Sequence, residues 1–338
     1  MATWIGIEHL IGRLTLLICL GLLCTLPASA QWHERTEAIM GTRIHVEFFS
    51  TAPDAERLLD RAIAEFHRID HAFSPYKESS ELSHLNRSAP QGWVDVSDEM
   101  SDLLAKSRRI STMTGGAFDI TYASVGRYYD YREGAAPNDA TLLAALQAIN
   151  YAYVDLDATA GRVRYRHPKV YVDLGGIAKG HAVDRVVDLL VAEGVEHLSV
   201  AAGGDSRIVG DRRGKPWTVG IRHPRQPDQM SAILPLVDTS VSTSGDYERY
   251  FERDGVRYHH ILDPSTGRSA QDAWSVTILG PDTTFTDALS TSVFVLGPER
   301  GLALIDSLPG IDAIIVDPTG RLLFSADLLE LNAADPSS

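Results

Sequence analysis

The sequence predicts a mixed α+β fold, with mixed or antiparallel sheets and packed helices instead of a doubly wound parallel sheet. Helix-like and strand-like segments follow one another irregularly along the 338 residues, whereas a doubly wound sheet requires strict alternation. An apolar content of 44% and a charged content of 22% are typical of a globular protein. We found no internal repeat and no convincing linker, so we expect one domain over residues 31–331 and a frayed tail over 332–338.

Residues 1–30 are typical of a secretory signal. Arg13 supplies a positive charge, Leu14–Leu23 is an apolar run too short to span a bilayer comfortably, and Ala28-Ser29-Ala30 is a small-residue cleavage site. We therefore expect a periplasmic protein. Both cysteines of the chain lie in this segment. A lipid anchor on Cys24 is the less favoured alternative, because bulky leucines precede it, and it is the only route to membrane association that we expect.

The first half of the mature chain contains a strand pair and two helices. Glu37–Phe49 is expected to form a strand pair or a bent strand, with the bend at Gly41. Pro53–Phe73 carries an apolar stripe at helical spacing, and Ser97 can cap a second helix over Asp98–Thr114. Ala117–Thr121 is expected to be a short extended piece.

The second half is richer in strands. Strands are expected within Tyr153–Tyr165, Leu198–Ala202, Trp217–Arg222, Ile233–Ser242, Tyr247–Leu262 and Trp274–Leu279. Helices are expected over Ala140–Ile149, Asp287–Val295 and Pro298–Leu308, and Asp317–Gly320 is expected to turn a final hairpin.

The chain is organised around Val170–Asp184. Its first residues alternate in polarity like a strand, two glycines follow, and an apolar helical pattern then runs to Gly194. A strand, a glycine turn and a helix leave backbone N–H groups pointing at one place, which favours an anion such as a phosphate. The P-loop is excluded because His181 and Ala182 replace Lys and Ser/Thr, and the dinucleotide glycine pattern is absent. An ordinary strand-to-helix turn that binds nothing is the alternative.

Two further stretches carry side chains suited to chemistry. In the first turn of a helix, Asp287, Ser290 and Thr291 would share one face, and their oxygens suit Mg²⁺; a simple dipole-compensating Asp is the alternative. His260 can act as a general base near neutral pH or can be a structural hairpin histidine. A net charge of −14 argues against general nucleic-acid binding.

A series of segments occurs in the order known from one family. They are Met40-Gly41-Thr42, FSPYKESSELSHLN (Phe73–Asn86), GGAFDIT (Gly115–Thr121), VDLGGIAKGHAVD (Val172–Asp184), AAGGD (Ala201–Asp205), WTVGIRHP (Trp217–Pro224), the block Ser242–Gly267 and TDALSTSVFVLG (Thr286–Gly297). In these segments the chain resembles the ApbE flavin transferases, which are FAD:protein FMN transferases. The departures are small: His181 stands where Tyr is usual, and Ser292 where Ala is usual.

The resemblance implies a T-fold-like α+β arrangement and a set of site residues. Contacts to FAD are implied for Met40, Tyr76, Ala117, Phe118, Asp119, Asp173, Lys179 and Ile261. A Mg²⁺ site is implied for the Gly176 carbonyl, Asp287, Ser290 and Thr291, although the position of Ser290 is Asp in some relatives. Lys179 would be a cation near the phosphates or the adenine, with a solvated helix lysine as the alternative.

The implied reaction cleaves the pyrophosphate of FAD with Mg²⁺, attaches FMN through a phosphoester to a threonine hydroxyl of a target protein and releases AMP. The acceptor hydroxyl must lose its proton, and His260 is the leading candidate for the base, with Asp287 the alternative. The expected targets are extracytoplasmic parts of membrane redox complexes. Two other functions use the same residues: an FAD pyrophosphatase that gives FMN and AMP, and a periplasmic flavin-binding protein without catalysis.

Overall fold

A single large antiparallel sheet forms the centre of the fold in the computed structural model, which describes residues 31–334. The predicted signal segment 1–30 lies outside the described residues, as do residues 335–338. The eight strands are ordered β1 (Gln31–Ile39), β2 (Thr42–Ser50), β6 (Leu198–Ala202), β7 (Asp205–Val209), β10 (Ser240–Gly245), β15 (Ser275–Gly280), β16 (Asp312–Val316) and β17 (Leu322–Phe324). Every neighbouring pair is antiparallel, which confirms the predicted α+β class.

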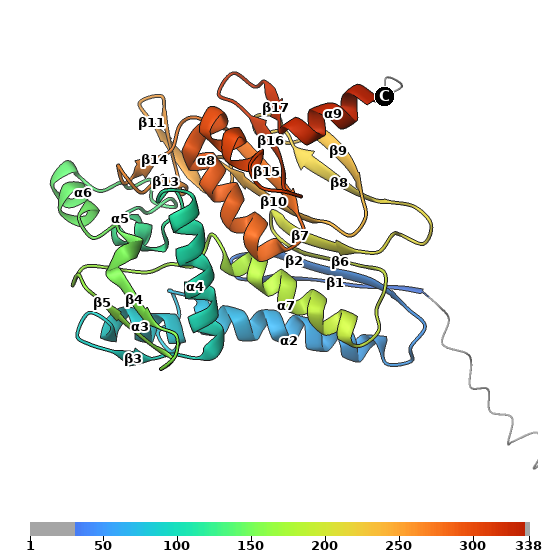
Figure 1. The fold of residues 1–338 in the computed structure, drawn as a ribbon, viewed down its shortest axis with the longest axis horizontal. Coiled ribbons are helices and arrows are strands. Elements are labelled where there is room, and N and C mark those ends of the chain that lie inside the picture. Colours follow the sequence, from blue (N-terminus) through green and yellow to red (C-terminus); the bar gives the residue numbers. More distant parts are fainter. Residues whose placement is uncertain (1–30, 335–338) are drawn as a thin grey trace, which may run out of the picture.

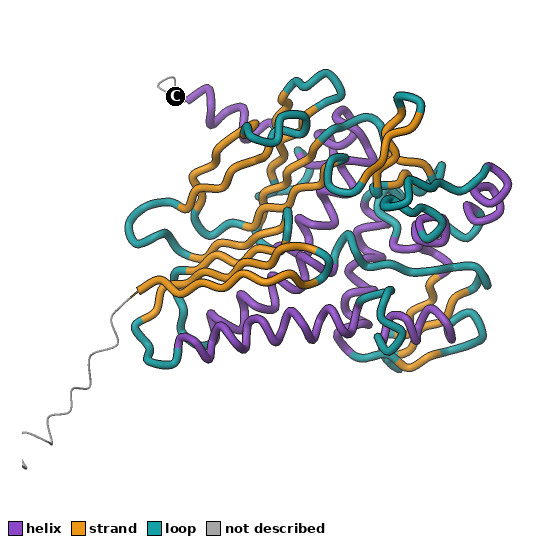
Figure 2. The backbone as a smooth tube through the Cα atoms, turned by 180° about the vertical axis from the view of Figure 1, so that it is seen from behind, coloured by secondary structure: helices purple, strands orange, loops and turns teal. Residues whose placement is uncertain are grey.

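Helices cover one face of this sheet. Figure 1 shows α2 (Ala55–Phe73), α7 (Ala178–Ala192) and α8 (Thr283–Ile305) in front of the strands, and the reverse view in Figure 2 shows the strands in front of the helices. The other helices are α3 (Glu81–Ser88), α4 (Asp98–Met113), α5 (Ala123–Gly126), α6 (Asp139–Leu146) and α9 (Ala326–Ala334). Short 3₁₀ turns occupy Ile120–Tyr122 and Tyr151–Tyr153.

Smaller sheets surround this core. A three-stranded sheet has the order β3 (Val94–Asp95), β5 (Arg162–Tyr165) and β4 (Val154–Asp157). Three two-stranded ribbons are formed by β8 (Trp217–Arg222) with β9 (Met230–Leu236), β11 (Tyr250–Arg253) with β12 (Val256–His259), and β13 (Leu262–Asp263) with β14 (Arg268–Ser269).

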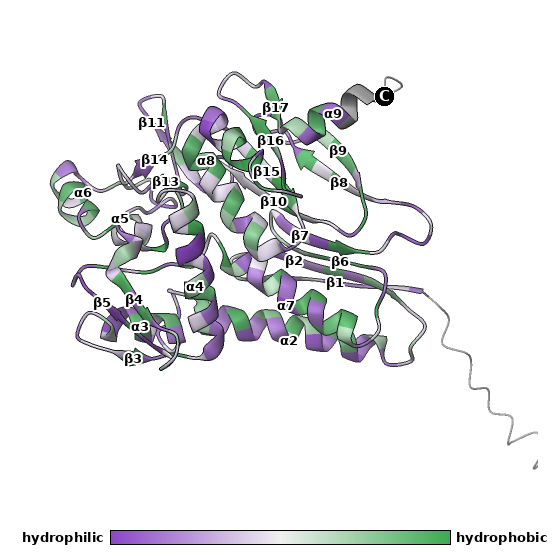
Figure 3. Ribbon diagram, viewed as in Figure 1, coloured by the Kyte–Doolittle hydropathy of each residue, from purple (hydrophilic) through white to green (hydrophobic). Residues whose placement is uncertain are grey.

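The core lies between the helices and the large sheet. Apolar side chains of α2 and α7, such as Phe66 and Val186, join Val46 and Val200 of the sheet in the largest buried cluster. Figure 3 shows hydrophilic and hydrophobic bands alternating along α2, as expected of a helix with one face in solvent. The expected helices of residues 53–73 and 98–114 and the strand pair bent at Gly41 are therefore confirmed.

Helix α8 is more apolar and passes through the second core cluster with β15 and β16. It has the length and composition of a membrane-spanning helix, but half of the apolar window is buried inside the fold, as in a core helix. Gly297 has non-helical angles (φ 75°), so α8 is kinked immediately before Pro298. This kink separates the two helices that the sequence predicts.

The segment Val170–Leu174 is not the predicted strand. Val170, Val172 and Leu174 are buried, so the predicted alternation is present, but the segment pairs with no strand of residues 31–334. The Asn86 side chain takes the place of a neighbouring strand, because its amide donates to Val172 O (2.8 Å) and accepts from Val172 N (2.8 Å). Local sequence periodicity cannot reveal such a partner from a distant helix.

Other boundaries also differ from prediction. The expected strand over 233–242 is divided between β9 and β10, which belong to different sheets. The extended piece at 117–121 ends in a 3₁₀ turn, the polar stretch after Ser79 forms α3, and α9 continues to Ala334. Helix α8 begins at Thr283 with Asp282 as its N-cap. Asp287 is therefore in the second turn, and it is not the first-turn carboxylate that would compensate the helix dipole.

Candidate active site

The predicted glycine turn and the predicted hydroxyl-bearing helix come into direct contact. Gly180 in the first turn of α7 lies against α8, and a methyl group at this position would be only 2.2 Å from Thr283 O and 2.8 Å from Asp287 Cβ. The Gly180 N–H donates to Asp287 Oδ2 (2.9 Å). Glycine is therefore required here for close approach of two helices.

A second carboxylate fixes the start of α8 against α7. Asp184, one turn beyond Gly180, accepts hydrogen bonds from the backbone N–H groups of Thr283 (2.9 Å) and Thr284 (2.7 Å). Arg207 on β7 donates to the same carboxylate (2.9 Å). Because free N–H groups at a helix start need acceptors, Asp184 and the N-cap Asp282 together fix the start of α8, and Asp184 ties that start to α7.

Two buried carboxylates and a half-buried ammonium meet at this helix contact. Lys179 Nζ lies 2.6 Å from Asp205 Oδ2 and 3.2 Å from Asp287 Oδ1. Both aspartates are only 2% exposed. Asp205 was not among the predicted site residues, although the AAGGD segment that ends in it was recognised. Its signal is the carboxylate that follows the glycine pair.

These charges shift one another's protonation. Burial raises the pKa of Asp287, and the negative charge of Asp205 acts in the same direction, while Lys179 and the Gly180 N–H oppose it. Burial acts to lower the pKa of Lys179, but the two carboxylates outweigh it and raise that pKa. Lys179 is therefore a charged ammonium, and the predicted alternative of a solvated helix lysine is wrong.

A row of hydroxyl groups runs between β10 and α8. Ser240, Ser242 and Ser244 of the strand contact Thr283 (3.1 Å), Thr286 (2.9 Å) and Ser290 (2.8 Å) of the helix. Ser244 Oγ is also 3.3 Å from Thr291 Oγ1. A methyl group at Gly176 would lie 3.4 Å from Thr291 Oγ1, so the Gly176 backbone lies beside the same hydroxyls. Thus all four predicted metal-site residues are in one neighbourhood.

Four amide groups of the glycine turn are not free for a phosphate. Gly175 N donates to Asp173 Oδ1 (2.6 Å), Ile177 N and Ala178 N donate to Leu174 O (3.0 and 2.8 Å), and Gly180 N binds Asp287. The predicted anion cradle is therefore wrong for these amides, since protein oxygens already accept their hydrogen bonds. The anion at the start of α7 is Asp287.

The hairpin β11–β12 brings His260 to the site. His260 N donates to Arg249 O (3.1 Å), and a methyl group at Gly41 would lie 3.2 Å from Arg249 Nη2. Arg249 therefore extends from the hairpin to the turn that contains Met40. Burial, aided by the positive charge of Arg249, lowers the pKa of His260 to about 3. Its Nδ1 is buried with no hydrogen-bond partner within residues 31–334.

The remaining predicted FAD contacts differ in exposure. Phe118 is buried and would be 3.3 Å from a methyl group at Gly176, which places it beside the metal-site residues. Asp119, next to Phe118, is also buried, and it accepts from Thr121 N (2.8 Å) and Tyr151 N (2.7 Å), so its carboxylate organises the local turn. Ala117 is buried before it, and Ile261 is buried after His260.

Two hollows lie at the predicted FAD residues. An open hollow of about 480 Å³ is lined by Met40, Thr42, Asp70 and Lys77, among others. A second, of about 380 Å³, is lined by Tyr76, Arg127 and Tyr171. Tyr76 is 83% exposed, as a side chain available to a ligand would be. Asp173 lies between Tyr171 and the glycine turn, and burial raises its pKa.

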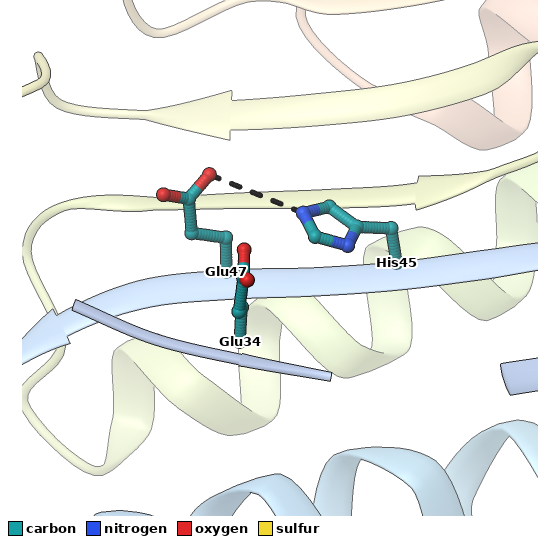
Figure 4. Close-up of side chains that lie close together, drawn as sticks. All are labelled: Glu34, His45 and Glu47. Atoms are coloured by element: carbon teal, nitrogen blue, oxygen red, sulfur yellow. Dashed lines mark ion pairs between the residues drawn. The ribbon is translucent and has the colours of Figure 1, made fainter. Parts of the chain in front are cut away.

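A separate cluster of metal-ligating residue types lies on β1 and β2. Figure 4 shows Glu34, His45 and Glu47, whose ligand atoms lie within 4.8 Å of one another. Glu47, however, is bound by both terminal nitrogens of Arg212 (2.6 and 3.1 Å). Arg212 already neutralises its carboxylate, and in the described part of the chain no hydrogen bond or ion pair joins these residues to Lys179, Asp205 or Asp287, so this cluster is an ion-pair network apart from the site.

Comparisons with known proteins agree with this geometry. The model of the ApbE family matches residues 40–315. The chain is 34% identical to the FAD:protein FMN transferase of Treponema pallidum over 340 residues, covering 95% of this chain and 94% of the relative. It is 34% identical to the enzyme of the same description from Vibrio cholerae over 283 residues, covering 79% and 82%.

Solved structures give the same result. The ApbE protein of Thermotoga maritima superposes with a TM-score of 0.82 at 35% identity, covering 89% of this chain and 99% of that one. The flavin transferase ApbE of Vibrio cholerae superposes with a TM-score of 0.80 at 28% identity, with the same coverage. On the family match, the identities and the shared fold, this chain belongs to the ApbE family.

Proposed function

We propose that this protein is an FAD:protein FMN transferase that uses Mg²⁺ to move FMN from FAD to a threonine hydroxyl of an acceptor protein, with release of AMP. The descriptions of its relatives support the transferase activity. The metal, the threonine acceptor and the leaving AMP are parts of the proposal that rest on the site.

The observation that carries the proposal is the buried charge balance around Lys179. When both carboxylates are ionised, as binding of a cation requires, Asp205 and Asp287 carry two negative charges against one positive charge on Lys179, and all three meet at the helix contact. A site with a net negative charge repels a diphosphate, so an added cation is needed before FAD can bind there productively. A divalent cation bound there would reverse the sign of the site and would neutralise charge that develops on the leaving phosphate.

The residues present suit such a cation. Mg²⁺ prefers carboxylate, hydroxyl and carbonyl oxygens, and it usually keeps water and binds substrate phosphates. Asp287 supplies a buried carboxylate, and Ser290 and Thr291 supply hydroxyls one turn later. The Gly176 backbone beside Thr291 offers a carbonyl. These four residues would hold the ion.

In the transfer step, the acceptor hydroxyl oxygen forms a bond to the FMN phosphorus while the bond from that phosphorus to the oxygen of AMP breaks. The hydroxyl proton must pass to a base, and AMP leaves with the oxygen that bridged the two phosphorus atoms. His260 can accept it, because its ring is neutral and its Nδ1 has no hydrogen-bond partner within residues 31–334, but a pKa of about 3 makes the ring a weak base in this state. Asp287 is the weaker candidate, because its carboxylate is already held by Lys179 and Gly180.

Covalent labelling tests this proposal. The protein, FAD and Mg²⁺ are incubated with an acceptor domain that carries a single reactive threonine, and with the same domain in which that threonine is replaced by valine. We expect a fluorescent flavin band that survives denaturation only with the threonine domain, and AMP in equal amount. AMP release at the same rate without acceptor would instead identify a pyrophosphatase. Intact FAD after incubation would identify a flavin-binding protein.

We also propose that the protein acts in the periplasm, on extracytoplasmic parts of membrane redox complexes. The signal-like segment 1–30 supports this location. Mass spectrometry of the exported chain tests it. A mature N-terminus at Gln31 is expected, whereas a lipid-modified N-terminus at Cys24 would indicate membrane anchoring.

A further inference from the structure

We propose that Asp205 is a positioning residue for the metal site, which holds the ammonium of Lys179 so that Asp287 stays available to a divalent cation. This inference rests on the proposed function, because it assumes that Asp287 binds the metal. It concerns a residue that contributes no ligand of its own to the predicted metal set.

The geometry gives Lys179 two acceptors of unequal closeness. Lys179 Nζ is 2.6 Å from Asp205 Oδ2, but 3.2 and 3.3 Å from the two oxygens of Asp287. The closer ion pair is therefore with Asp205. If a cation takes an oxygen of Asp287, Lys179 keeps a buried partner without having to leave the site.

The position of Asp205 is itself rigid. It is the first residue of β7 and follows the turn Gly203-Gly204, in which added methyl groups would lie 2.5 Å from Thr42 Oγ1 and 2.6 Å from Thr243 O. Asp205 also stands opposite Ser242 of β10 in the sheet register. A carboxylate on a central strand of the sheet is held more precisely than one on a loop, as a positioning role requires.

Removing Asp205 leaves Lys179 with one acceptor. The ammonium and Asp287 would then form a neutral buried pair, and a divalent cation would have to displace the ammonium and bring two uncompensated positive charges into a buried site. We therefore expect weaker metal binding. Outer partners of metal ligands typically change metal affinity by about 10–100-fold when mutated.

A double-mutant cycle with Mn²⁺ as the probe tests the inference without relying on activity. Mn²⁺ binding is measured by electron paramagnetic resonance for the wild type, Asp205→Asn, Lys179→Met and the double variant, with Asp287→Ala to identify binding at this site. Asp205→Asn should raise the Mn²⁺ dissociation constant by about tenfold. Lys179→Met should change it by less than about threefold alone but recover most of the loss in the double variant.

The coupling between the two substitutions separates this role from a simple loss of charge. Simple addition of charges predicts that Lys179→Met shifts affinity by the same factor in both backgrounds, and this result would overturn the inference. An unchanged Mn²⁺ affinity in Asp205→Asn would overturn it too. If the wild type binds no more Mn²⁺ than Asp287→Ala, the metal site of the proposed function fails with it.

Two further variants control for structural damage. Asp246→Asn removes another buried carboxylate that is paired with cations, Arg225 (2.6 Å) and Arg257 (3.3 Å), and it should leave Mn²⁺ affinity unchanged. Asp205→Glu keeps the charge, so its Mn²⁺ dissociation constant should be closer to that of the wild type than the constant of Asp205→Asn. An Asp205→Glu protein that folds but loses as much affinity as Asp205→Asn would contradict the proposed charge role.

Discussion

The contact between α7 and α8 leads to a prediction for Gly180→Ala. The added methyl group would lie 2.2 Å from Thr283 O and 2.7 Å from Thr283 C, which are backbone atoms and cannot rotate away. The helices must separate by roughly 1 Å to restore an ordinary contact. The hydrogen bond from Gly180 N to Asp287 (2.9 Å) and the two from α8 to Asp184 (2.9 and 2.7 Å) would lengthen with them.

The magnitude follows from three opposing effects. Overpacking costs about 1–3 kcal/mol, and weakening one or two buried hydrogen bonds costs about 1 kcal/mol each. The higher helix propensity of alanine stabilises the folded protein by about 1 kcal/mol relative to glycine. We therefore expect a net loss of about 1–4 kcal/mol in the free energy of unfolding, or a Tm lower by roughly 2–6 °C.

Urea denaturation measures the stability, and the covalent flavin band measures the transfer rate. Gly92→Ala is the matched control, because its methyl group meets no atom within 4 Å. It should change stability by less than about 0.5 kcal/mol. A Gly180→Ala protein with wild-type Tm and wild-type transfer would refute the argument that close approach of the helices positions Asp287.

Three other predictions concern single residues. Asp287→Asn keeps the shape of the side chain but removes its charge, so metal-dependent FAD cleavage should be lost while the circular dichroism spectrum is unchanged; a variant with wild-type turnover would exclude Asp287 as a ligand. Asp184→Asn loses its ion pair with Arg207 and an acceptor at the start of α8, so it should cost about 1–3 kcal/mol in urea denaturation, and an unchanged midpoint would contradict its capping role. His260, with a folded-state pKa of about 3 against 6.5 in the unfolded chain, contributes stability that is present above pH 6.5 and is lost as pH falls toward 3. At pH 5 this loss is about 2 kcal/mol relative to pH 7, so His260→Gln should flatten the pH dependence of the free energy of unfolding. An equal slope of unfolding free energy against pH in both proteins would show that the ring is not buried as described.

Elements with local signals could be predicted from the sequence. The helix over Asp98–Met113 has Ser97 as its cap, with Ser97 Oγ accepting from Met100 N (3.2 Å). Helix α7 ends before Gly194, which has φ 84° as a terminating glycine should. In both cases the residues that decide the structure are within a few positions of one another, so the pattern is sufficient.

Elements that depend on distant partners could not be predicted. Val170–Leu174 has the alternation of a strand, but Asn86 binds the backbone of Val172 at its centre, and no feature of the segment itself indicates that. The glycine pair before Asp205 marks the residue, but its ion pair with Lys179 depends on the fold. A local signal for the hydroxyl row did exist, because Ser240, Ser242 and Ser244 alternate along one strand face.

The glycine turn shows why a correct segment can receive a wrong physical explanation. The sequence predicts that Gly175 and Gly176 free backbone N–H groups for a phosphate, and the pattern does mark the site. In the structure, amides of this turn donate to protein oxygens, and Gly180 allows the close approach of α8. Because protein oxygens accept hydrogen bonds from four amides of this turn, we expect cations to neutralise most of the phosphate charge. The resemblance implied those cations, and the spacing of the glycines alone could not.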